Sequence, residues 1–263
     1  ESALVRPLGK CELRMNNAKL LLALVTLLTL TAGTSQSQTR LGSTHKIAIS
    51  KGWEFHEVGK DAWHPAIVPG VVHTDLLNNK LIDDPFYRDN EQKQQWIGKT
   101  DWEYKTSFNV TAETLARENI ELVFEGLDTY ANVFLNNESL LNADNMFRTW
   151  RVDCKRLLKP GANTLRIRFR SPINEVLPLM AKMEYQLPTG NDQGEKTSPH
   201  TRKAPYQFGW DLGPRFVTSG VWRPVYLESW EKARVEDLHI LPTQVTAAAA
   251  NLRAEVEVVA NSQ

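Results

Sequence analysis

The sequence has 263 residues, enough for one well-packed domain and part of a second. Lys plus Arg and Asp plus Glu number 31 each, so the formal net charge is zero. A balanced chain has no basic stripe for a phosphate backbone, and we expect no nucleic-acid partner.

Residues 15–40 have the features of an export signal. One lysine precedes an apolar run at residues 20–30, and small polar residues follow. The run is shorter than the roughly 20 apolar residues that a membrane-spanning helix needs, so we interpret it as a signal peptide with a short linker and expect no membrane anchor. Residues 1–14 precede Met15 and are expected to be vector or upstream sequence. The protein would be periplasmic or extracellular in a bacterium and lysosomal in a eukaryote.

Alternating apolar and polar residues predict β-strands through the middle of the chain. In residues 103–110, the side chains of Tyr104, Phe108 and Val110 fall on one face. The same pattern recurs in residues 119–126, 130–141, 160–170 and 221–229, with an Asn-Asn turn inside the second of these segments. Helical periodicity is nearly absent, apart from one short turn expected within residues 111–118. The pattern indicates an all-β sandwich over residues 41–230.

Residues 178–209 break this alternation with many polar residues and prolines at both ends. Compact domains seldom keep structureless loops longer than about 15 residues unless the loop is functional or disordered. We therefore expect this segment to have a function.

Residues 231–263 alternate again and predict two further strands. A complete immunoglobulin-like sandwich needs about 100 residues, so these strands would be the first part of an incomplete second domain.

The usual catalytic signatures are absent from the sequence. It has no G-x-S-x-G elbow, H-E-x-x-H pair, C-x-x-C pair, P-loop or dinucleotide fingerprint. The six histidines are scattered, and no pair of carboxylates is fixed at the separation of about 5 Å that a retaining glycosidase needs. We expect no metal site, no cofactor and no catalytic residue in this chain. Cys154 is expected to be a buried or half-buried bystander.

One motif suggests carbohydrate binding. Trp210 and Asp211 stand side by side between Gly209 and Gly213. An indole can cover the apolar C–H face of a sugar, and a carboxylate can accept hydrogen bonds from two neighbouring hydroxyls. The alternative is a buried tryptophan beside an ion pair between Asp211 and Arg215. Residue types alone support both interpretations equally.

Two stretches of the sequence carry a family resemblance. Residues 63–76, WHPAIVPGVVHTDL, follow the pattern W-x-P-A-x-V-P-G-x-V-H-x-D-L, and residues 202–215, RKAPYQFGWDLGPR, resemble R-K-x-x-Y-x-F-G-W-D-W-G-P-R. With DPFYRDNE at residues 84–91, they make the chain similar, from residue 47 onward, to the N-terminal portion of β-mannosidases of glycoside hydrolase family 2.

The resemblance implies a jelly-roll, galactose-binding-like domain, an immunoglobulin-like domain and then a (β/α)₈ barrel with both catalytic glutamates. It also implies retaining hydrolysis of terminal, non-reducing β-D-mannose. A barrel of about 250 residues has no counterpart in this sequence, so we expect the chain to be inactive alone and to pack against its own missing barrel. The expected partners are β-mannoside saccharides.

The same resemblance assigns roles to single residues. Asp211 would bind ring hydroxyls, and Trp210 would line the subsite. Arg202, Lys203, Gly209 and Gly213 would position the loop. The sequence departs from the motif at Leu212, where the family has tryptophan. Leucine keeps apolar contact but lacks an indole N–H and a flat face, which puts affinity or specificity for mannose in question.

Two other functions remain open at this stage. The jelly roll could act as a free-standing carbohydrate-binding module, although the half-built second domain argues against this. The tryptophan-rich loop could instead dock a protein partner.

Overall fold

The structure, a computed structural model, describes residues 11–13 and 44–261. The chain divides into two compact units. One is His45–Ser229, and the other includes the described residues 11–13 and 230–261. The expected signal peptide at residues 15–40 lies outside the described residues. Within the described ranges, every helix is too short or too polar to span a bilayer.

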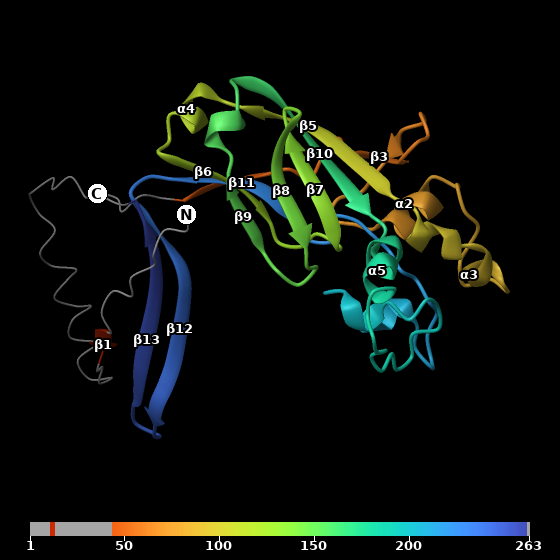
Figure 1. Ribbon diagram of the computed structural model, residues 1–263. Helices are drawn as coiled ribbons and strands as arrows, with labels where there is room; N and C mark the ends of the chain where they lie inside the picture. The colour runs from red at the N-terminus through yellow and green to blue at the C-terminus, as the bar shows by residue number, and fades with distance from the viewer. Residues whose placement is uncertain (1–10, 14–43, 262–263) are drawn as a thin grey trace, which may run out of the picture. The chain divides into compact units, whose positions relative to one another are not determined.

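The His45–Ser229 unit is built on two β-sheets, and the expected all-β sandwich is confirmed (Figure 1). One sheet has the order β4 (His64–Pro65), β3 (Glu54–Glu57), β5 (Trp102–Val110), β10 (Gly161–Arg170), β7 (Tyr130–Leu135) and β8 (Glu138–Asp144). The other has the order β2 (His45–Ala48), β11 (Val225–Trp230), β6 (Asn119–Phe124) and β9 (Trp150–Asp153).

Strand β10 shows how the alternation specifies the sheet. Leu165, Ile167 and Phe169 are fully buried, while the arginines between them are exposed or half-buried. Ile167 lies opposite Tyr104 of β5 on one side and opposite Val133 of β7 on the other, in antiparallel register. Because side chains alternate with a period of two, a register slip by one residue would expose this whole apolar row.

The two sheets share one apolar core. Phe55, Tyr104 and Phe169 fill it from the larger sheet, and Leu122 and Phe124 fill it from the smaller one. Burying a side chain of this size stabilises the fold by about 1.5–3 kcal/mol. Cys154 is also buried there, and burial raises the pKa of its thiol to about 12, as expected of a bystander.

Within residues 44–261, the sheets are accompanied by the short α-helices α2 (Val72–Asn78), α3 (Asn90–Lys93), α4 (Ala112–Leu115) and α5 (Pro172–Met180). The turn expected within residues 111–118 is α4, where the Thr111 hydroxyl accepts a hydrogen bond from the Thr114 N–H. Helices α2 and α5 were not anticipated, because segments of seven and nine residues are too short to show a clear helical period.

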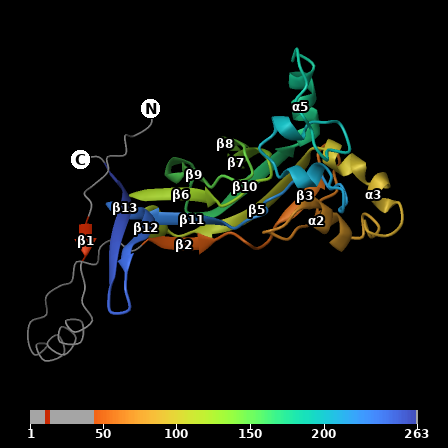
Figure 2. The same ribbon diagram turned by 90° about the horizontal axis from the view of Figure 1, so that it is seen from below.

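A long segment without strands, residues 181–218, follows α5 and is called the loop region below. It contains the 3₁₀ turns η3 (Ser198–His200) and η4 (Pro205–Phe208). Two further 3₁₀ turns, η1 (Gln95–Lys99) and η2 (Lys155–Leu157), lie outside the loop region. The loop region and α5 lie together at the end of the sandwich that also carries α2 and α3 (Figures 1 and 2).

The second unit contains an antiparallel hairpin. Its strands are β12 (Ala233–Val245) and β13 (Ala250–Ala260), and β13 also pairs with β1 (Cys11–Leu13). Both segments that alternate in the sequence therefore form strands. Their assignment to an immunoglobulin-like domain stays a prediction.

Candidate functional site

The Trp-Asp motif forms an exposed turn at the end of the loop region. The Trp210 carbonyl accepts a hydrogen bond from the Gly213 N–H at 3.5 Å, which closes the turn. Trp210 is 49% exposed, Leu212 is 91% exposed, and Asp211 is exposed between them. The segment 210–213 is called the Trp210 turn below. Its three side chains are all accessible to a ligand.

Gly209 lets the chain enter this turn. Its φ of +129° lies in the region that only glycine adopts readily. A Cβ on Gly209 would also lie 2.6 Å from the Asn191 carbonyl oxygen, which is closer than atoms can pack. Gly213 has neither constraint, since the nearest atom to a Cβ there would be 3.5 Å away.

Gln193 fixes the Trp210 turn from a neighbouring segment. Its backbone N–H donates to the Phe208 carbonyl at 3.0 Å, and its side-chain Nε2 donates to the Trp210 carbonyl at 3.0 Å. Asp192, the residue before it, is buried and accepts from the Gly194 and Ser198 N–H groups at 2.9 and 3.0 Å. A locally hydrogen-bonded loop therefore supports the turn.

In the same loop region, Lys203 forms a buried ion pair with Asp128. The Lys203 ammonium donates to an Asp128 carboxylate oxygen and, at 2.8 Å, to the Thr218 carbonyl. Gln207 Nε2 donates to the second Asp128 oxygen at 3.2 Å. Burial lowers the pKa of Lys203, while the Asp128 charge acts in the opposite direction. This network ties the loop region to Asp128, two residues before β7.

Arg202 is placed differently from Lys203. It is exposed, and its backbone carbonyl accepts a hydrogen bond from the Met146 N–H at 3.0 Å. The structure therefore brings Lys203, Gly209 and the Trp210 turn into one supported loop, while the Arg202 side chain lies on the surface beside them.

Arg215 does not pair with Asp211. Its guanidinium donates to Glu195 at 2.6 Å and to the Gln95 side chain, and its backbone N–H donates to Glu91 Oε1 at 2.7 Å. Among the hydrogen bonds and ion pairs of the described residues, none involves the Asp211 side chain. The alternative ion pair considered from the sequence is thus not formed, and Asp211 keeps its hydrogen-bonding capacity for a ligand.

The sequence did not predict the acidic partners of the loop region, Asp128, Glu91 and Glu195. Asp128 lies 75 residues from Lys203, and Glu91 lies 124 residues from Arg215. No local pattern could have paired residues so far apart. The only hint was the presence of Glu91 in the DPFYRDNE motif.

His73 and Asp75 of the W-x-P-A-x-V-P-G-x-V-H-x-D-L motif lie on α2 and contact different neighbours. Asp75 accepts from the Tyr104 hydroxyl at 2.8 Å and from the Ile67 N–H at 2.9 Å, and burial raises its pKa to about 6. His73 packs against the Phe216 ring, and burial, assisted by the positive charge of Lys203, lowers its pKa to about 4. Residues two apart on a helix point to different sides, so these side chains reach different neighbours.

No cluster of three or more His, Cys, Asp or Glu side chains that could hold a metal ion occurs within residues 11–13 and 44–261. The site offers instead one free carboxylate, one exposed indole and one exposed leucine. This donor set can accept hydrogen bonds from hydroxyls and cover an apolar face.

Comparisons with known proteins agree with the fold. The family described as glycosyl hydrolase 2 galactose-binding domain-like matches residues 53–223. The chain is 37% identical over 203 residues to a β-mannosidase B of Neosartorya fischeri and 32% identical over 208 residues to a β-mannosidase of Mus musculus. These matches cover 75% and 77% of this chain and 24% of each relative.

A solved structure gives the same result. A β-D-mannosidase from Dictyoglomus thermophilum superposes with a TM-score of 0.78 at 38% identity. The superposition covers 82% of this chain and 26% of that one. The chain thus spans about a quarter of the length of the relatives that it matches.

Proposed function

The chain belongs to the glycosyl hydrolase 2 galactose-binding domain-like family, and from that premise we propose that it serves as the non-catalytic N-terminal part of a β-mannosidase. In this function it supplies one wall of the pocket for a terminal, non-reducing β-D-mannose residue. The catalytic acid/base and nucleophile belong to a separate catalytic portion of the enzyme. The His45–Ser229 unit acts as a galactose-binding-like domain, and the hairpin of β12 and β13 begins an immunoglobulin-like one.

The observation that carries this proposal is the exposed, unpaired Asp211 on a supported turn. A carboxylate without an internal partner can accept two hydroxyl hydrogen bonds, and charge-assisted bonds are about twice as strong as neutral ones. The indole of Trp210 stands beside it and is 49% exposed, and an indole face can cover a sugar ring. The buried Lys203–Asp128 pair and the Gln193 contacts hold the turn in place before the ligand arrives.

Leu212 gives the pocket wall an aliphatic side chain where similar proteins have an indole. It is 91% exposed, so its role depends on what covers it. A leucine contacts a sugar through methyl groups only. We expect affinity for mannose to be weaker than with tryptophan at this position.

The protein reaches its substrate outside the cytoplasm. The apolar run within residues 15–40 supports export by a signal peptide. Its partners are β-mannoside saccharides and the catalytic portion of its own polypeptide.

Replacing Asp211 tests the proposal in an enzyme that has both parts. In a chimera, this chain replaces the matching portion of the Dictyoglomus thermophilum β-mannosidase. Asp211→Ala in the chimera should lower kcat/KM for a chromogenic β-mannoside about 10- to 100-fold, since hydrogen bonds to a charged group are worth about 1.5–3 kcal/mol. Asp61→Ala is the matched control, because Asp61 is also exposed. An unchanged kcat/KM in Asp211→Ala would refute the proposal.

The 263-residue chain alone separates this function from that of a free-standing carbohydrate-binding module. Calorimetric titration with mannose and mannobiose should show no binding, and the chain should not hydrolyse the chromogenic substrate. Millimolar or tighter binding would favour the module. Hydrolysis by the purified chain would contradict the assignment of the catalytic residues to another part of the enzyme.

A further inference from the structure

The C-terminal part of helix α5 is apolar where it is exposed, whereas the exposed Asn174 in its first turn is polar. Ile173 and Val176 are fully buried against the unit. Leu177 and Leu179 are 40% and 56% exposed. A helix at the surface of a domain normally turns polar residues to solvent. Leu177 and Leu179 depart from that pattern at the C-terminal end of α5.

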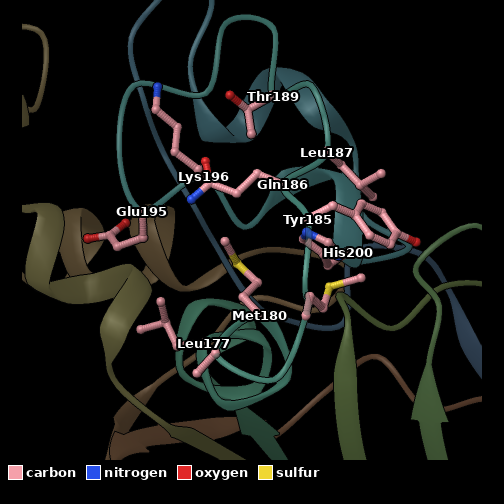
Figure 3. A pocket seen from close by; sticks show the side chains of 11 residues that line it. Leu177, Met180, Tyr185, Gln186, Leu187, Thr189, Glu195, Lys196 and His200 are labelled. Atoms are coloured by element: carbon pink, nitrogen blue, oxygen red, sulfur yellow. The ribbon is translucent and has the colours of Figure 1, made fainter.

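The chain that follows α5 extends this apolar area. Met183 and Tyr185 are exposed, and with Leu177, Leu179 and Met180 they make up what we call the α5 surface. A cavity of about 490 Å³ opens between α5 and the loop region, and Leu177, Met180, Met183 and Tyr185 line it. In Figure 3, Met180 points from α5 into the space below the segments that carry Gln186 and Glu195.

The apolar part of this lining suits an apolar side chain of a protein, and the charged groups of the lining are already paired. Glu195 is already bound by Lys99 and by Arg215, each at 2.6 Å. The Lys196 ammonium donates to the Asp192 carbonyl. These two charged groups are therefore occupied, and the uncharged polar side chains of the lining are Gln186, Thr189, His200 and Tyr185. Methionine and leucine side chains adapt instead to an apolar partner.

We propose that the α5 surface is the docking site for the catalytic portion of the enzyme, and that an apolar side chain of that portion fills the cavity. This inference rests on the proposed function, in which the chain works attached to a catalytic portion. The relatives supply an occupant of sufficient size, because the matched region covers only 24–26% of their length. An exposed apolar patch is what such an interface requires of a separated domain.

Docking at this surface also fixes the Trp210 turn. The segment 192–196 takes part in both places: Glu195 lines the cavity, and Gln193 donates to the Trp210 carbonyl. A partner seated against α5 would hold this segment from one side while the Lys203–Asp128 pair holds the loop region from the other. The pocket wall and the domain interface would therefore be set by one stretch of chain.

Photo-cross-linking in the chimera tests the docking site. A benzophenone amino acid at Leu177 should cross-link to peptides of the Dictyoglomus catalytic portion. The same group at Glu113 is the control and should give no such product, because Glu113 is exposed on α4, at the opposite end of the two sheets from α5 (Figure 1). Cross-links from Leu177 to a second copy of the chain, or to no part of the catalytic portion, would overturn the proposal. Loss of the cross-links from position 177 when mannobiose is added would also overturn the proposal, since a saccharide would then occupy the cavity.

A substitution gives a second readout. Leu179→Asp should lower the midpoint of thermal unfolding of the chimera and leave that of the 263-residue chain unchanged, because the side chain is exposed in the separate chain. Equal shifts in both proteins would contradict docking at this surface. Neither readout depends on hydrolysis. Hydrolysis without Leu177 cross-links would refute the docking site alone, while cross-links combined with normal kcat/KM in Asp211→Ala would refute the pocket role alone.

Discussion

The two sheets and the loop region both bury much of their chain, but different groups fill their interiors. The interior between the sheets is apolar, and the backbone N–H and C=O groups of the strands are paired with those of neighbouring strands. The loop region buries only a small apolar cluster that includes Phe208 and Val217. Its interior is held by charged and polar side chains, among them Lys203, Asp192 and Arg215.

This difference shows how a segment without strands can be well ordered. Backbone groups that lack a ladder need other partners, because a buried unpaired N–H or C=O is costly. Asp192, Gln193 and Lys203 provide such partners in the loop region. The sheets should therefore be sensitive to lost volume, and the loop region to lost charge and hydrogen bonds.

The largest effect is expected when the buried ion pair is broken. Lys203→Met should lower the free energy of unfolding by about 3–5 kcal/mol, because it leaves Asp128 buried with an uncompensated charge. Urea denaturation of the 263-residue chain measures the change. Lys93→Met is the control: it breaks the exposed Lys93–Asp89 pair, and such pairs contribute about 0–1 kcal/mol. Equal losses in the two variants would mean that the loop region does not depend on its buried charge.

A smaller effect is expected at the entry to the Trp210 turn. Gly209→Ala should cost about 1–3 kcal/mol, because alanine is strained at a φ of +129° and its Cβ would meet the Asn191 carbonyl. Gly213→Ala, two residues beyond the Trp-Asp pair, should change stability by less than about 0.5 kcal/mol. Thermal unfolding of both variants compares them directly. A tolerated alanine at Gly209 would indicate that the loop takes another path.

The smallest net effect is expected from pH, because two groups on α2 act in opposite directions. Asp75 accepts a hydrogen bond from the hydroxyl of Tyr104 in the larger sheet. Its pKa in the folded protein is about 6, above the ordinary value of 3.8. Its contribution to stability is therefore present at low pH and is lost as pH rises through about 6. His73 lies beside the loop region, and its folded pKa of about 4 lies below the ordinary 6.5. Its contribution is lost as pH falls below 6.5 toward 4.

Two variants separate these contributions. Relative to the unmodified chain, Asp75→Asn should gain stability as pH rises from about 4 to about 6, the window set by the two Asp75 pKa values. His73→Phe should lose relative stability as pH rises from about 4 to about 6.5. Denaturation series at matched salt concentration give both slopes. Parallel curves for all three proteins would show that neither group titrates differently in the folded state.

Much of the sandwich could be predicted from the sequence. The alternation in residues 103–110 and 160–170 located β5 and β10, and the Asn-Asn pair located the β7–β8 turn. Side-chain alternation is a local property, so it can be read without knowing the partner strand. Helices α2 and α5 could not be predicted, because about two turns of helix contain too few residues to show a helical period.

The candidate site could be predicted only in part. The motif singled out Trp210 and Asp211, but residue types could not decide whether Asp211 pairs with Arg215. The fold answers this by giving Arg215 other partners, Glu195 and Gln95, from different segments. Similarly, nothing near Lys203 in the sequence indicated that Asp128 would neutralise it.

The sequence by itself determined the strand pattern, the β-sandwich class and the family motifs, because these depend on neighbouring residues and short spacings. Only the tertiary structure decided which charges are buried in pairs and which carboxylate stays free. Coulomb attraction and desolvation act between groups that the fold brings together, often from positions far apart in the chain. Asp211 stays unpaired because Arg215 binds Glu195 and Glu91 instead.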